Sequence, residues 1–128
     1  MKARRSPASA APAGGATFEL AASVAVQVDG FVLGAAFAGD GFFAATGEGA
    51  LYGFAEDGAV RFTRPTAHDG ILAFAVSPDG AAVVTGGQDG CARLWRIAGT
   101  EIARLPAKAA WVEHVAWRGD GAEIATAG

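Results

Sequence analysis

The sequence is short of the residues that build disulfides and metal centres. Its 128 residues include one cysteine, Cys91, and two histidines, His68 and His114. A single cysteine cannot form a disulfide within the chain and leaves no CxxC pair for zinc. The two histidines do not stand at the spacing of a metal-ligand motif. We therefore expect no metal and no cofactor, and the lone cysteine favours a cytoplasmic protein.

Long apolar runs are also missing. The best candidate, Phe31–Gly39, stops at Asp40, well short of the ~18 residues that a membrane span needs. Residues 1–16 lack the apolar stretch of a secretory signal. Such a segment cannot bury a core, so we expect a disordered leader over 1–16, and no membrane partner. Its acid-free composition, rich in Arg, Ala and Ser, leaves an organellar transit peptide as the alternative.

Positive charge is scarce outside this leader. Three of the ten basic residues lie in 1–16, so seven accompany all 13 acidic residues in the rest of the chain. An acidic body does not suit a phosphate backbone, which argues against nucleic-acid binding. Apolar residues reach 52 % and charged residues only 18 %, which favours a packed domain. The 19 glycines are typical of strands and turns rather than helices.

Three segments of the chain repeat one pattern. Each centres on an Asp-Gly pair, at Asp40, Asp79 and Asp120, which gives spacings of 39 and 41 residues. A threonine follows each aspartate by six positions, although the chain has only seven threonines. These threonines are Thr46, Thr85 and Thr126. A period near 40 residues is typical of propeller blades, in which each repeat is a four-stranded sheet.

Each period predicts four short antiparallel strands. In the middle repeat these are ILAFAV, AAVVTG, CARLWRI and EIARL, with turns between them. We expect Asp-Gly to supply the positive φ angles that tight hairpins need. The predicted fold is all-β, a partial β-propeller over residues 17–128 with two complete four-stranded antiparallel blades plus half a third. The predicted blade limits are about 31–64, 71–106 and 112–128. Phe37, Trp95 and Trp117 are expected to fill the core between blades.

The segments SPDG, TGGQDG and RLW in the middle repeat resemble the WD40 repeat. In that family a buried network joins a histidine, a second-strand Ser or Thr, a turn aspartate and a tryptophan. Carried over, the resemblance assigns these roles to His68, Thr85, Asp89 and Trp95. Ala67 replaces the family's glycine before the histidine, and Arg96 replaces the aspartate of its Trp-Asp pair. The first and third repeats hold Asp29 and Ala109 in the histidine column, so only the middle repeat has all four.

About three repeats cover residues 31–128, whereas a propeller usually has 4–8 blades. We therefore expect a truncated, N-terminal portion of a WD40 propeller. A chain complete at residue 128 would instead have open strand edges, which favour self-association.

The sequence assigns no catalytic residue. It has no GxSxG motif, and its glycine-rich segment at 47–53 lacks the spacing of a nucleotide loop. The resemblance places first strands at the propeller axis, where the chain has Ala36, Ala75 and Ala116 and no convergent polar groups. We expect no enzyme. An alternative is a ligand-binding or enzymatic propeller whose site lies in missing blades or a fused domain.

The resemblance implies a scaffold for protein–protein interaction that binds through loops on one rim. The rim residues in this chain are Glu48, Asp69, Gln88, Trp111 and Glu113. Their acidic bias favours a basic protein or peptide partner. Trp111 is open to two interpretations, partner contact and packing. A purely structural segment with no site of its own remains a third hypothesis.

Overall fold

All regular secondary structure in the described part of the chain consists of β-strands. The computed structural model describes the backbone of residues 2–10 and 18–128, and side chains from Val24 onward. In chain order the strands are β1 (Lys2–Ala10), β2 (Phe18–Gln27), β3 (Val32–Ala38), β4 (Gly41–Thr46), β5 (Leu51–Ala55), β6 (Val60–Arg64), β7 (Ile71–Val76), β8 (Ala82–Gly87), β9 (Cys91–Arg96), β10 (Glu101–Pro106), β11 (His114–Trp117) and β12 (Ile124–Ala127). No described residue belongs to a helix long and apolar enough to cross a membrane.

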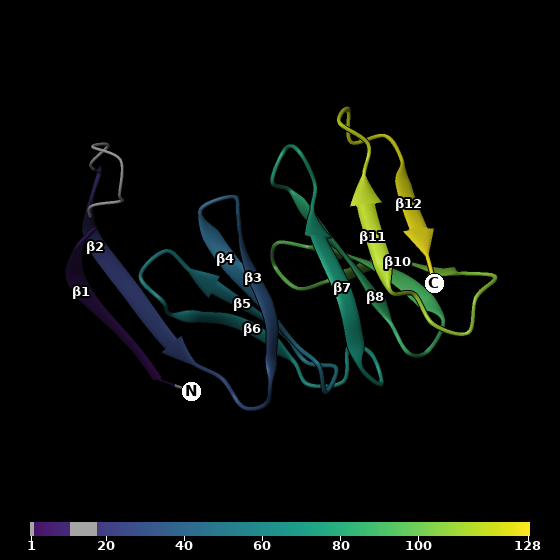
Figure 1. Ribbon diagram of the computed structural model, residues 1–128, viewed down its shortest axis with the longest axis horizontal. Coiled ribbons are helices and arrows are strands. Elements are labelled where there is room, and N and C mark those ends of the chain that lie inside the picture. The colour runs from purple at the N-terminus through teal and green to yellow at the C-terminus, as the bar shows by residue number, and fades with distance from the viewer. Residues whose placement is uncertain (1, 11–17) are drawn as a thin grey trace.

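Two four-stranded antiparallel sheets stand side by side (Figure 1). One contains β3 to β6 and the other β7 to β10, each in sequence order, so every connection is a short hairpin. Strands β11 and β12 pair beside the second sheet as a two-stranded unit. The predicted all-β fold of two complete blades and half a third is confirmed.

The hairpins between first and second strands form around the Asp-Gly pairs. Gly80 and Gly121 follow their aspartates and have φ angles of 70° and 72°, as expected. In the first repeat the positive angle, 58°, belongs to Gly39, which precedes Asp40. Ala38 pairs with Gly41, which leaves Gly39 and Asp40 as the two turn residues. The expectation that the glycine after the aspartate takes this angle is therefore wrong for the first repeat.

The largest buried cluster lies between the two blades. Phe43 and Phe62 of the first blade pack with Ile71, Val83 and Trp95 of the second. The two phenylalanine rings lie 5.5 Å apart between centroids. Full burial of such side chains contributes about 1.5–3 kcal/mol each. Much of the hydrophobic stabilisation of this fold therefore comes from contacts between blades.

Phe37 corrects the expected core. Its side chain is 83 % exposed, whereas Trp95 is buried as expected. Val76 and Trp117 hold the same position in the next two repeats, and each contacts the preceding blade: Val76 packs on the cluster between blades, and Trp117 Nε1 donates to Ala75 O at 3.0 Å. In the described structure no four-stranded blade comes before the one that holds Phe37. Its side chain instead lines an apolar groove between β2 and β3. It remains exposed because no full blade covers it.

The N-terminal segment also differs from the sequence expectation. Lys2–Ala10 forms β1, which pairs antiparallel with β2. A disordered leader was expected over 1–16. Residues 2–10 form a strand instead, and Met1 and residues 11–16 lie outside the described residues. The physical reason is that the edge of β2 offers backbone N–H and C=O groups that need hydrogen-bond partners.

Candidate functional site

A chain of hydrogen bonds runs through the middle blade. His68 lies in the loop before β7, Thr85 on β8 and Trp95 on β9, and all three are buried. His68 Nε2 lies 2.7 Å from Thr85 Oγ1, and Trp95 Nε1 donates to the same oxygen at 2.8 Å. His68 Nδ1 lies 2.9 Å from Asp89 Oδ1, in the turn after β8. The structure thus brings together the four residues that the WD40 resemblance assigned to one network.

The direction of these bonds is consistent with a neutral imidazole. Trp95 can only donate, so Thr85 Oγ1 accepts from it, and in a neutral ring with its proton on Nδ1 the His68 Nε2 accepts the Thr85 hydroxyl hydrogen. The remaining His68 proton, on Nδ1, then points to the Asp89 carboxylate. Burial lowers the pKa of His68, because desolvation of the imidazolium outweighs the hydrogen bond and charge of Asp89.

Asp89 connects this network to the turn that follows it. Its carboxylate also accepts from the Cys91 amide at 3.2 Å and forms a salt bridge with Arg93 Nη2. Burial alone would raise the pKa of Asp89, but His68, the Cys91 amide and Arg93 lower it overall. Arg93 was missed at the sequence level. Its position four residues after Asp89, on the strand that holds Trp95, is the signal that could have indicated it.

The first blade has apolar packing in place of this network, and the third repeat has neither among the described residues. In the first blade Thr46 is buried and its Oγ1 accepts from the Ala50 amide at 3.1 Å. Phe54, near the tryptophan column, is buried and stacks on Phe42 with centroids 4.9 Å apart. Thr126, the third equivalent, is exposed. The hydrogen-bonded set of four therefore belongs to the middle blade among the described residues.

The predicted rim residues occupy loops at one end of the sheets. That end lies along the lower edge of Figure 1, where β7 and β11 begin. Backbone bonds join adjacent loops there: His68 N to Gly49 O at 3.2 Å, Gln88 N to Gly70 O and Val112 N to Gly87 O, both at 3.0 Å. All five predicted residues are exposed on these loops: Glu48, Asp69, Gln88, Trp111 and Glu113.

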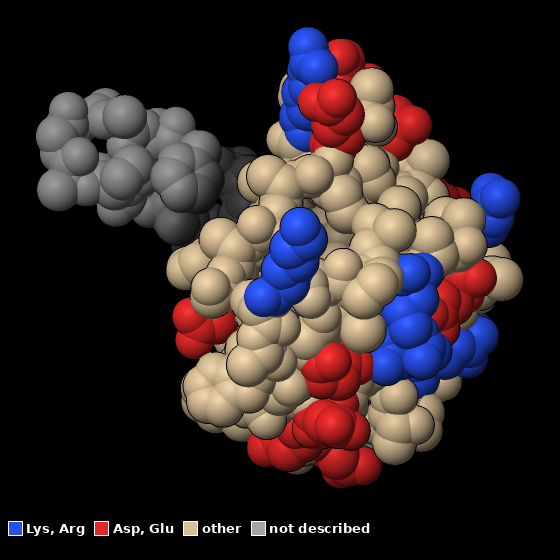
Figure 2. Space-filling model, turned by 90° about the vertical axis from the view of Figure 1, so that its right-hand side faces the viewer, with Lys and Arg blue, Asp and Glu red and all other residues tan. Residues whose placement is uncertain are grey.

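Aromatic and acidic side chains are available on this rim. Trp111 is 52 % exposed, so a large part of its side chain is accessible to a partner. Phe31, in the loop before β3, is 72 % exposed and was not singled out from the sequence. The Glu48 carboxylate accepts from the Phe31 backbone amide at 2.9 Å, which holds this acid at the loop before β3. In the view of Figure 2, acidic side chains gather at the lower end of the molecule, the level of these loops.

No metal-binding cluster is formed by the His, Cys, Asp and Glu residues of the described segments. Cys91 is a half-buried thiol at the start of β9. His114 is exposed on β11. The first-strand positions hold alanine at Ala36, Ala75 and Ala116, as the sequence shows.

Antiparallel four-stranded blades with a buried His–Thr–Asp–Trp network define a protein of the β-propeller class. The WD40 family model, described as "WD domain, G-beta repeat", matches residues 58–96. That match contains the whole network, so the chain contains a WD40 repeat at its middle blade. No curated protein matches the chain. WD40 domains are in general interaction modules without catalysis.

Proposed function

We propose that this chain is a scaffold for protein–protein interaction, without catalysis of its own, and that its rim binds a basic protein or peptide. The observation that carries the proposal is the continuous rim, in which backbone hydrogen bonds join successive loops. An exposed tryptophan on an ordered backbone is a typical centre of a binding surface, because its large area is already oriented. A cytoplasmic location is part of the proposal and is supported by the single, unpaired cysteine.

The charge of the rim supports a basic partner. Asp69 and Glu113 are exposed, so their carboxylates are available to a basic partner. Opposite charges at an interface raise the association rate and exclude like-charged partners. Rim charges therefore affect specificity, whereas Trp111 supplies contact area.

A peptide array tests both parts. We would probe short peptides that vary in net charge with the wild-type protein, with Asp69→Lys/Glu113→Lys and with Trp111→Ala. The matched control, Glu56→Lys/Glu123→Lys, makes the same charge change in turns at the opposite end of the strands. We expect basic peptides to bind the wild type and the control, and to lose binding to both rim variants. Equal binding by the rim charge variant and the control would contradict the proposal.

A further inference from the structure

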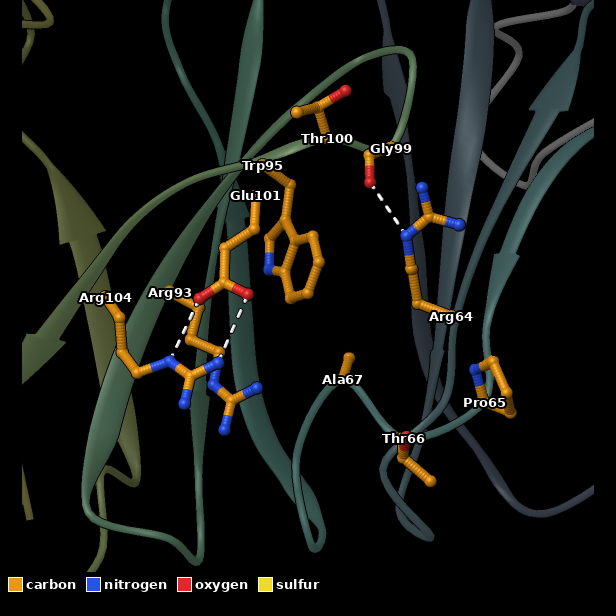
Figure 3. Close-up of a pocket in the computed structure, with 10 residues that line it drawn as sticks. All are labelled: Arg64, Pro65, Thr66, Ala67, Arg93, Trp95, Gly99, Thr100, Glu101 and Arg104. Atoms are coloured by element: carbon orange, nitrogen blue, oxygen red, sulfur yellow. Dashed lines mark hydrogen bonds and ion pairs between the residues drawn. The ribbon is translucent and has the colours of Figure 1, made fainter.

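A concave surface lies between the two complete blades, and none of the five predicted rim residues lines it. Its cavity has a volume of about 410 Å³. The first blade contributes Arg64, at the end of β6, and the loop that follows it. The second blade contributes Arg93 and Trp95 on β9 and Arg104 on β10 (Figure 3). Three guanidinium groups from three strands therefore line one cavity.

The negative charge around this cavity is smaller than the positive charge. Glu101 is the one carboxylate in the lining, and it pairs with Arg104 through two bonds of 3.0 and 3.3 Å. Arg93 pairs with Asp89, which lies outside the lining. Two carboxylates thus pair with two of the three guanidinium groups. One positive charge is uncompensated, and it belongs to Arg64.

Arg64 is held in place without being neutralised. Its Nε donates to Gly99 O at 2.9 Å, and its Nη1 to Thr63 O at 3.1 Å. Its guanidinium also lies 5.4 Å from the centroid of the Phe62 ring. Among the described residues it has no salt bridge. These contacts fix the fork of the side chain at the cavity wall, so that little conformational entropy remains to be lost on binding.

Arg93 adds an unused donor. Its Nε is buried and has no hydrogen-bond acceptor among the residues that the structure describes. A buried charged N–H without a partner is unfavourable, because no hydrogen bond replaces the water that it lost on folding. Buried polar groups without a hydrogen-bond partner are uncommon in native proteins. Arg93 also lines the cavity, so an oxyanion bound there would lie beside its guanidinium charge.

We propose that this cavity binds the phosphate of a phosphomonoester. Arginine forks suit an oxyanion with several acceptor oxygens, and charge-assisted bonds to phosphate are strong ones. A tetrahedral group can accept from guanidinium groups that approach from different strands, which a planar carboxylate does less well. A dianion also competes better than a carboxylate with Glu101 for Arg104. The proposed site is independent of the rim and of the partner proposed there.

The first experiment titrates inorganic phosphate into the full chain and follows binding by calorimetry. We expect saturable binding by the wild type, and a loss of about tenfold or more in affinity for Arg64→Gln, since each 1.4 kcal/mol is a factor of ten. Arg104→Gln is a second variant, with an exposed side chain whose loss leaves the core intact. Arg96→Gln is the matched control, because Arg96 is exposed on the same strand as Arg93 and does not line the cavity. The far-ultraviolet circular dichroism of each variant checks its fold.

A second set of titrations identifies the source of the phosphate. Three short alanine peptides carry phosphoserine, serine or glutamate at the centre. Tighter binding of the phosphoserine peptide than of phosphate would show that a peptide carries the group, and equal binding would show that the phosphate alone is recognised. No saturable phosphate binding, equal affinity in Arg64→Gln and wild type, or a glutamate peptide that binds as well as the phosphoserine peptide would each overturn the proposal.

Discussion

His68 Nε2 and Thr85 Oγ1 lie 2.7 Å apart, both buried, at the centre of the middle blade. The hydroxyl serves two partners at once, because it also accepts from Trp95 Nε1. Removal of this one oxygen leaves two buried nitrogens without a partner. Two buried hydrogen bonds of the network therefore depend on the one hydroxyl group of Thr85.

Thr85→Val should lower the free energy of unfolding by about 2–4 kcal/mol, because a methyl group replaces the shared hydroxyl and two buried polar atoms lose their bonds. Thr126→Val is the matched control in the third repeat, where the side chain is exposed, and should change it by less than about 0.5 kcal/mol. Urea denaturation measures both values. Equal effects in the two variants would show that the buried network does not stabilise the fold.

Stability should fall in mild acid because of His68. Its pKa is lowered in the folded state from a usual value of 6.5, so the unfolded state binds more protons below that pH. The stability contribution is complete above about pH 6.5 and is lost as the pH falls below it. Urea unfolding of the wild type at about pH 5 and about pH 7.5 should show this difference. His68→Gln should reduce the difference, whereas His114→Gln, at an exposed position, should retain it.

Phe37→Ser should have little effect on folding despite the loss of an aromatic ring. Its side chain is already 83 % exposed, so we expect a change of less than about 1 kcal/mol in unfolding free energy. Phe43→Ala, in the cluster between blades, should cost about 3–5 kcal/mol. Thermal unfolding of the two variants compares the positions directly. A large loss for Phe37→Ser would mean that the groove beside it is filled in solution.

Trp111→Ala should separate binding from stability. The exposed ring contributes little to the fold, so the unfolding free energy should change by less than about 1 kcal/mol. Affinity for a basic peptide selected on the array should fall by about 2 kcal/mol or more if this ring is the centre of the rim surface. Calorimetric titration of the selected peptide gives the affinity. Unchanged affinity would remove Trp111 from the proposed surface.

The sequence predicted the blades because their signals are local. Asp-Gly pairs at a constant spacing indicate hairpins, and a hairpin needs only its own residues to form. The four network residues were predicted through the WD40 resemblance, and the structure joins them by hydrogen bonds. Phe37 was predicted wrongly because its environment depends on which sheet lies opposite it. No local pattern carries that information.

The cavity between blades was not predictable from the sequence. Arg64, Arg93 and Arg104 lie 29 and 11 residues apart along the chain, and they meet because the second blade turns its outer strands toward the end of β6. Arg64 has no charge pattern around it that distinguishes it from a solvent-exposed base. Only the packing of two blades identifies it as part of a site.

Contacts between neighbouring blades determine the order in which parts of this molecule unfold. Each sheet meets only its immediate neighbours, so its free energy is approximately a sum of repeat terms and nearest-neighbour terms, as in a one-dimensional array. The middle blade has both the hydrogen-bonded network and neighbours on two sides, whereas β11 and β12 have one neighbour and two strands. Among strands β3 to β12, amide hydrogen exchange should therefore be faster in β11 and β12 than in β8 and β9, so that the middle blade opens after the two-stranded unit.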